Sequence, residues 1–120
     1  MTTPIPILYA DDDLLFIDKP AGLLSVPGKT EPDCVEARLR LQFPEALTVH
    51  RLDMATSGVM IFARNKPAQR HIGLQFERRH LKKRYVAVVD GIVAADDGHI
   101  DLPLRADWPN RPLQMVCHEE

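Results

Sequence analysis

The stretch HRLDMATSGVMIF, residues 50–62, places three ionisable side chains directly ahead of an apolar run. Burying an unpaired charge is costly, so a carboxylate next to a buried strand requires an explanation. Asp53, shielded from water, can act as a nucleophile or a base, and Arg51 can steady it or bind phosphate. Alternatively, Asp53 caps its turn by accepting hydrogen bonds from the backbone amides of Thr56 or Ser57, and spacing alone favours this alternative.

His50 is open to several roles. No other His or Cys stands at ligand spacing from it, so we expect no metal site. A serine-hydrolase arrangement with Asp53 and Ser57 lacks the sharp turn around the nucleophile and the oxyanion loop. A hydrogen-bonded structural histidine, or one near a phosphate, fits better. We therefore keep His50 as a candidate substrate-binding residue.

A strongly basic segment follows the apolar run. Residues 64–84, RNKPAQRHIGLQFERRHLKKR, hold eight Lys and Arg and one acidic residue, although the whole chain has a net charge of −2. Such a segment predicts a polyanion-binding surface. The alternative, a solvated helix face, usually balances its charges with nearby acids, and only Glu77 is available. The candidate substrate-binding residues in this segment are Arg64, Lys82, Lys83 and Arg84.

Tyr85 begins a strand that the pattern RYVAVVDG predicts at about residues 84–90. One face of this strand would carry Tyr85, Ala87 and Val89. An aromatic ring beside a phosphate-binding surface can stack on a nucleobase. A core tyrosine with a satisfied hydroxyl is an equally good interpretation.

The elements that must position these residues are strands and two helices. Strands are predicted at about 5–10 and 14–18 around an aspartate-rich turn, before a loop rich in proline and glycine. Asp33 and Glu36 resemble a capping box at the start of a helix that Pro44 ends.

Further strands and a second helix are predicted after Pro44. An extended segment, LTVHRLD, leads through a turn at Gly58 into a strand of about residues 58–64. Asn65 can cap the next helix and Pro67 suits its first turn. The apolar stripe of that helix is formed by Ala68, Ile72 and Phe76.

Composition sets the broad class of protein. A chain of 120 residues with 45% apolar content fits one globular domain or part of one. The start of the chain lacks the features of a signal peptide, and no window approaches the roughly 20 apolar residues of a membrane span, so we expect a cytoplasmic protein with no membrane partner. Cys34 and Cys117 lie far apart, which favours reduced, structural thiols.

Four segments together resemble a known family. HRLDMATSG followed by KKRYVAVVDG resembles the first two motifs of the RluA-type pseudouridine synthases. The segments KPAGLLSVPG and DLPLRADWPNRP resemble the same family, and the second is similar to the RluA subgroup, whose members modify both ribosomal and transfer RNA. The resemblance covers essentially the whole chain.

The resemblance implies a fold, a reaction and roles for matching residues. The fold is α+β, with a mixed, mostly antiparallel sheet and flanking helices. Asp53 matches the catalytic aspartate, Tyr85 the tyrosine that packs against the target uracil, and Arg51 the arginine that helps to hold the flipped-out nucleotide. The reaction isomerises uridine in structured RNA without cofactor or metal, and the expected substrate is a tRNA anticodon stem-loop, a large-subunit rRNA hairpin, or both. DNA is not an expected partner.

Members of this family continue well beyond the length of this chain, and their later half carries a third motif whose basic residue pairs with the aspartate. We therefore expect residues 1–120 to form the N-terminal part of a single catalytic domain, with the C-terminal half absent and no N-terminal RNA-binding domain of the S4 type. Two alternatives remain open: a non-catalytic RNA-binding fragment, and a soluble α+β domain with a basic protein-binding face.

Overall fold

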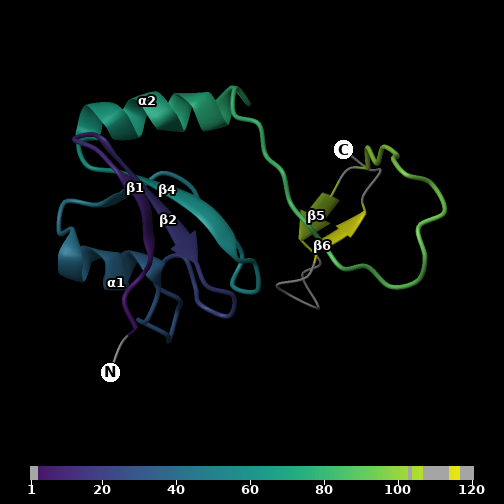
Figure 1. Cartoon of the computed structure of the whole chain (residues 1–120), viewed down its shortest axis with the longest axis horizontal. Helices are drawn as coiled ribbons and strands as arrows, with labels where there is room; N and C mark the ends of the chain where they lie inside the picture. Colours follow the sequence, from purple (N-terminus) through teal and green to yellow (C-terminus); the bar gives the residue numbers. More distant parts are fainter. Residues whose placement is uncertain (1–2, 103, 107–113, 117–120) are drawn as a thin grey trace. The chain divides into compact units, whose positions relative to one another are not determined.

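The computed structural model describes residues 3–102, 104–106 and 114–116. The chain divides into two compact units, Met1–Arg84 and Tyr85–Glu120. The first unit contains β1 (Ile7–Ala10), β2 (Leu14–Lys19), α1 (Val35–Gln42), β3 (Leu47–Thr48), β4 (Gly58–Ala63) and α2 (Lys66–Glu77) (Figure 1). The second unit contains β5 (Leu104–Ala106) and β6 (Gln114–Val116), which pair in an antiparallel hairpin.

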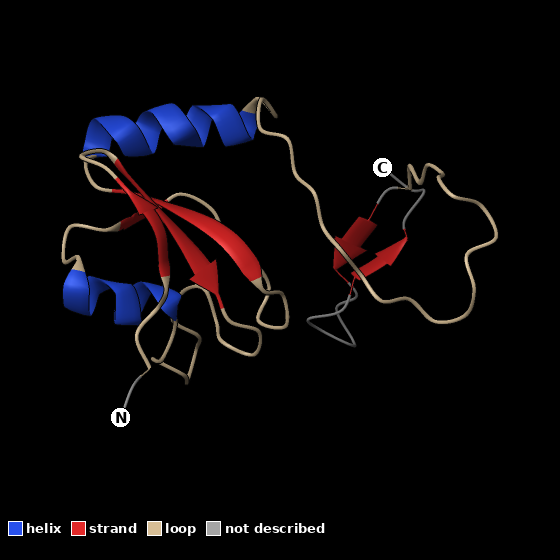
Figure 2. Cartoon of the chain, in the orientation of Figure 1, coloured by secondary structure: helices blue, strands red, loops and turns tan. Residues whose placement is uncertain are grey.

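The first unit is built on a four-stranded sheet with the strand order β1-β2-β4-β3. Each pairing between these strands is antiparallel. The central pair, β2 and β4, stays in register from Leu14 opposite Ala63 to Lys19 opposite Gly58. The two helices lie on opposite sides of the sheet (Figure 2). The prediction of an α+β fold with a mixed, mostly antiparallel sheet and flanking helices is confirmed, and the described strands of this sheet are all antiparallel.

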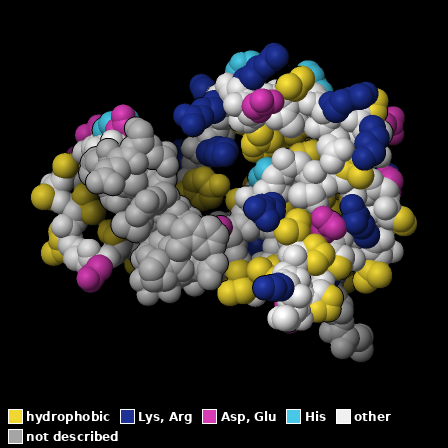
Figure 3. Space-filling view, turned by 180° about the vertical axis from the view of Figure 1, so that it is seen from behind, with side chains coloured by type: hydrophobic (Ala, Val, Ile, Leu, Met, Phe, Trp, Pro, Cys, Tyr) yellow, Lys and Arg dark blue, Asp and Glu magenta, His cyan; other side chains and the backbone are white. Residues whose placement is uncertain are grey.

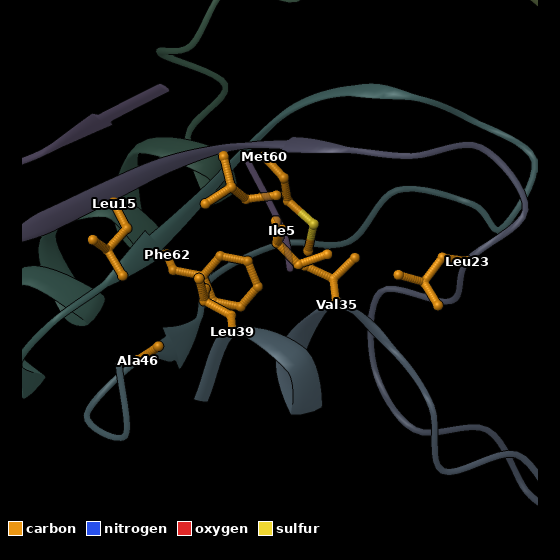
Figure 4. Packing of buried hydrophobic residues seen from close by; sticks show 9 residues of the cluster. Ile5, Leu15, Leu23, Val35, Leu39, Ala46, Met60 and Phe62 are labelled. Carbon is orange, nitrogen blue, oxygen red and sulfur yellow. The ribbon is translucent and has the colours of Figure 1, made fainter. Parts of the chain in front are cut away.

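The core lies between the sheet and α1. Leu15 and Ile17 of β2 and Phe62 of β4 point to the same side because side chains alternate along a strand, and all three are fully buried. Val35 and Leu39 of α1 pack in the same cluster (Figure 4). Full burial of each such side chain contributes about 1.5–3 kcal/mol.

The start of α1 differs from the predicted capping box. Cys34 is the residue that caps the helix, and its Sγ accepts a hydrogen bond of 3.3 Å from the backbone amide of Ala37. The carboxylate of Asp33 instead accepts two hydrogen bonds from Arg38, at 2.9 and 2.7 Å. Two parallel hydrogen bonds from a guanidinium are stronger than the bond that a capping carboxylate accepts from a neutral backbone amide, so the Asp33 carboxylate pairs with Arg38 rather than capping the helix.

The start of α2 confirms its prediction. The side-chain oxygen of Asn65 accepts a hydrogen bond of 2.9 Å from the backbone amide of Ala68, and Pro67 lies in the first turn. Ile72 is buried, and Ala68 and Phe76 are half-buried on the same face. The expected apolar stripe therefore holds α2 on the sheet.

The predicted strand at residues 84–90 is wrong. These residues pair with none of the described strands, and the side chains of Val86 and Val88 are almost completely exposed. A strand exists through hydrogen bonds to a neighbouring strand, so β-branched residues alone do not produce one.

Two remaining expectations concern cysteines and the membrane. Cys34 is buried as a free thiol, whereas Cys117 and much of DLPLRADWPNRP lie outside the described residues. Among the described residues, neither helix has the length and the hydropathy that crossing a membrane requires.

Leu39 and Leu41 offer a matched test of this core. Leu39 is 1% exposed and Leu41, on the same helix, is 80% exposed. We expect Leu39→Ala to lower the free energy of unfolding by about 2–5 kcal/mol, because it leaves a cavity in the core. Leu41→Ala should change it by less than about 0.5 kcal/mol. Urea unfolding measures both, and equal effects would contradict the described packing of α1.

Candidate active site

Asp53 lies in the connection between β3 and β4, residues 49–57, which we call the aspartate loop. Asp53 and Arg51 are both exposed, whereas Leu52 between them is half-buried and packs against the core. The loop therefore turns its two charged side chains outward and its apolar side chain inward. The expectation that Asp53 is shielded from water is wrong for the described residues, because none of them covers this side chain.

The alternative role of Asp53 as a side-chain cap is also wrong. The backbone amide of Thr56 donates a hydrogen bond of 3.0 Å to the backbone carbonyl of Asp53, which closes the turn without the carboxylate. The carboxylate has no hydrogen-bond partner in the part of the chain that the structure describes. Its oxygens are therefore available to a substrate.

Ser25 fixes the residue before Asp53. The Ser25 hydroxyl donates a hydrogen bond of 2.6 Å to the carbonyl of Leu52 and accepts one of 3.0 Å from its amide. Ser25 is 4% exposed, so water competes little for these two bonds. The segment KPAGLLSVPG, which contains Ser25, thus contacts the aspartate loop and provides a partner for both the amide and the carbonyl of Leu52.

Lys19 fixes the residues after Asp53. The ammonium of this fully buried lysine donates hydrogen bonds to the carbonyls of Pro20, Met54 and Thr56, at 2.9, 3.0 and 2.7 Å. The amide of Gly22 also donates to the carbonyl of Met54, at 2.7 Å. Gly22 has a φ of +86°, a conformation that glycine adopts without strain.

The charge of Lys19 is coupled to that of Asp53. Burial lowers the pKa of Lys19 below its ordinary value, and the negative charge of Asp53 raises it in part. The three carbonyl acceptors compensate the ammonium for its lost water. Asp53 is therefore an exposed carboxylate whose charge interacts with the buried ammonium of Lys19.

Sequence reasoning missed both Lys19 and Ser25 as site residues. A signal for Lys19 was present, because it falls on the same face of β2 as Leu15 and Ile17, and a lysine on the core side of a strand requires partners. The strand periodicity alone does not say which partners these are. Ser25 lies in a loop, where no periodicity predicts orientation.

His50 is held inside the fold. Its Nε2 accepts a hydrogen bond of 3.0 Å from the backbone amide of Ile61 in β4. Its ring stacks on that of Phe76 in α2, with the centroids 4.5 Å apart and an interplanar angle of 24°. Burial, and to a lesser degree the charge of Lys83, lowers the pKa of His50. These contacts confirm a hydrogen-bonded histidine, and contact with substrate stays a prediction.

Arg64 also has partners within the chain. Its guanidinium donates a hydrogen bond of 2.7 Å to the carbonyl of Asp11, lies 3.8 Å from a carboxylate oxygen of Glu45, and sits 5.2 Å from the ring centroid of Phe43. These contacts join the β1 to β2 turn to the end of β4. The assignment of Arg64 to substrate binding stays a prediction.

The rest of the basic segment is mostly exposed. Lys82, Lys83 and Arg84 follow α2 with exposed side chains, and Lys and Arg gather along the upper part of the face in Figure 3. The Lys83 ammonium lies 5.5 Å from the ring centroid of Phe76. A cavity of about 410 Å³ is lined by Phe76, Arg79, Leu81 and Lys83. This surface offers mainly positive charge, because the ring of Phe76 is already stacked on His50.

Tyr85 is the first residue of the second unit and is 62% exposed. An exposed phenol ring is available for stacking, and the alternative of a core tyrosine is wrong for the described residues. Its pairing with Asp53 at one site stays a prediction.

The chain is similar to proteins of one known family. A family model described as RNA pseudouridylate synthase matches residues 13–120. Two relatives, from Vibrio vulnificus and Escherichia coli K12, are each named dual-specificity RNA pseudouridine synthase RluA and are 54% and 52% identical over 115 residues. The alignments cover 94% of this chain and 46% and 52% of the relatives, so the chain spans about half their length.

Solved structures agree with this result. The human RNA pseudouridylate synthase domain containing 4 protein superposes with a TM-score of 0.53 at 29% identity, over 62% of this chain and 30% of its own. The corresponding human protein numbered 1 gives a TM-score of 0.54 at 28% identity, over 62% and 28%.

Replacement of Lys19 tests the support of the aspartate loop. Lys19→Met keeps the approximate length of the side chain but removes the donor to three carbonyls, of which only that of Met54 keeps another donor among the described residues, the Gly22 amide, so we expect the free energy of unfolding to fall by about 2–4 kcal/mol. Lys29→Met, at an exposed loop lysine, is the control and should change it by less than about 0.5 kcal/mol. Urea unfolding of both variants gives the comparison, and a Lys19→Met variant as stable as the control would refute the support.

The pKa of His50 predicts a dependence of stability on pH. Because this pKa lies below its ordinary value of 6.5, the unfolded chain takes up a proton at a pH where the folded chain does not. The advantage of the wild type over His50→Gln in unfolding free energy should therefore shrink as the pH falls from about 7.5 to about 5.5. Urea unfolding across this range measures the difference, and an advantage that grows in acid would contradict the assignment.

Proposed function

Because this chain belongs to the RNA pseudouridylate synthase family, we propose that it provides the catalytic aspartate, Asp53, for isomerising uridine to pseudouridine in structured RNA. The observation that carries the proposal is an exposed carboxylate, without a hydrogen-bond partner among the described residues, on a loop fixed by Ser25 and Lys19. A reacting group that is accessible and also held by its neighbours suits catalysis by positioning.

The reaction requires a group close to both the sugar and the base. The bond between C1′ and N1 of uridine breaks, the uracil turns, and a bond forms between C1′ and C5. The proton on C5 is released, and N1 ends with a proton. Asp53 takes part as a nucleophile or as a base, and its fixed position supports either route.

A stacked uridine must leave its helix before a carboxylate can reach it, at a cost of a few kcal/mol. Arg51 is exposed two residues before Asp53. Its guanidinium can bind a phosphate and so help to hold the nucleotide in its extruded position. Tyr85 is the candidate for stacking on the uracil, which offsets about 1–3 kcal/mol of that cost. His50, the first residue of the same motif, contacts β4 and α2 within the fold.

The basic segment supports RNA as the partner. Lys82, Lys83 and Arg84 are exposed and offer positive charge to phosphates. Since the relatives carry dual-specificity names, we propose a tRNA anticodon stem-loop and a large-subunit rRNA hairpin as substrates. The cytoplasm, where both RNAs occur, is the proposed location.

Asp53→Asn tests the catalytic role. It keeps the shape of the side chain but removes its negative charge, so we expect release of tritium from C5-labelled uridine in transcribed tRNA and rRNA hairpins to fall by at least about 10³-fold. Asp18→Asn, at an exposed aspartate in β2, should keep the activity of the wild type.

The result distinguishes the alternatives. Product from the wild type and none from Asp53→Asn supports the enzyme. Salt-sensitive RNA binding without product from the wild type supports a non-catalytic RNA-binding fragment. The absence of RNA binding at low salt supports a domain whose basic face binds a protein.

A salt titration tests the basic segment separately from catalysis. We expect Lys82→Ala to reduce the slope of log affinity against log salt for a tRNA stem-loop by about 0.7–0.9, because one phosphate contact is lost. Lys29→Ala, at the exposed loop lysine outside this segment, should leave the slope unchanged. Filter binding at several salt concentrations gives the slopes, and equal slopes for the two variants would contradict an RNA contact at Lys82.

A further inference from the structure

We propose that His50 is a positioning residue whose ring ends β3 and directs the aspartate loop out of the sheet, so that Arg51 and Asp53 are presented from a fixed starting point. This inference rests on the proposed function for its catalytic consequence, and its geometry stands on the contacts of the ring alone.

The register of the sheet shows what the ring replaces. β3 pairs with β4 at two positions, Leu47 opposite Ala63 and Thr48 opposite Phe62. Continued pairing would bring Val49 opposite Ile61. Instead the backbone amide of Ile61 donates its hydrogen bond to Nε2 of His50, at 3.0 Å. The ring therefore satisfies a strand amide that would otherwise need a backbone carbonyl, and the chain is free to leave the sheet.

A second contact fixes the orientation of the ring. Phe76 of α2 stacks on His50 with the centroids 4.5 Å apart. The half-buried imidazole is thus held by a directional hydrogen bond from the sheet and by a flat contact from the helix. Two contacts from different elements leave the ring little freedom to rotate.

The chemistry of the ring requires one protonation state. To accept a hydrogen bond, Nε2 must be unprotonated, so the neutral ring carries its proton on Nδ1. The neighbouring groups favour this state: β4 presents a backbone amide, α2 an uncharged ring, and the segment after α2 the positive charge of Lys83. A second proton on His50 would remove the acceptor and leave the Ile61 amide unsatisfied.

The consequence for the loop follows from its other attachments. Ser25 holds Leu52, and Lys19 holds Met54 and Thr56. With His50 anchored, Arg51 and Asp53 each lie between two anchored residues. Without this anchor, the loop loses its support on the β3 side, and the position of Arg51 is the first to be affected.

Two variants separate the hydrogen bond from the stacking. His50→Phe keeps an aromatic ring against Phe76 but has no acceptor, whereas the amide oxygen of His50→Gln can accept from Ile61. Hydrogen exchange of the Ile61 amide, followed by NMR on the 120-residue chain, should be faster by about tenfold or more in His50→Phe. In His50→Gln it should stay within about threefold of the wild type. The ring nitrogens of the wild type should show a neutral imidazole with its proton on Nδ1.

Kinetics give the readout that a purely structural residue would not affect. We expect His50→Phe to lower kcat for pseudouridine formation on the order of tenfold, with little change in KM for RNA, and His50→Gln to restore most of it.

The NMR measurements test the hydrogen bond between His50 and Ile61 even if the chain shows no activity. A ring protonated on Nε2, or unchanged Ile61 exchange in His50→Phe, overturns the inference. If His50→Phe does not fold, the ring spectrum of the wild type and Ile61 exchange in His50→Gln decide it. A wild type that forms no product refutes the proposed function, and the spectra still test the anchor.

Discussion

The buried ammonium of Lys19 is the interaction on which the site depends. A lysine in the core is costly unless each of its donors has an acceptor, and the carbonyls of Pro20, Met54 and Thr56 provide them. Because two of these carbonyls belong to the aspartate loop, the cost of burying the charge is offset only when that loop is in place. The fold of the loop and the stability of the core are therefore coupled.

This coupling explains how an exposed carboxylate can be well positioned. Leu52 is held by Ser25, and the carbonyl of Met54 is held by Lys19 and Gly22, so the backbone on either side of Asp53 is fixed while its side chain meets solvent. The charge of Asp53 also interacts with the buried ammonium of Lys19. The side chain of Asp53 is thus accessible to solvent, while Lys19, Gly22 and Ser25 fix the backbone of the loop.

Three expectations drawn from local sequence patterns were wrong. Asp33 had the spacing of a capping box, yet Arg38 offered its carboxylate a stronger bidentate partner. Residues 84–90 had the composition of a strand, yet none of the described strands pairs with them. Asp53 was expected to be shielded, yet the loop turns it outward. For Asp33 the stronger partner lies only five residues away, whereas residues 84–90 lack a pairing strand and Asp53 lacks a covering group among the described residues.

The sequence by itself determined the periodicity of the strands and of α2, the asparagine cap at Asn65, the basic segment, and the motif that contains Arg51 and Asp53, since these depend on neighbouring residues and on composition. Only the tertiary structure decided that Lys19, Ser25 and His50 hold the aspartate loop. Their partners lie 35, 27 and 11 residues away, and no local pattern records a hydrogen bond between a side chain and a distant backbone group.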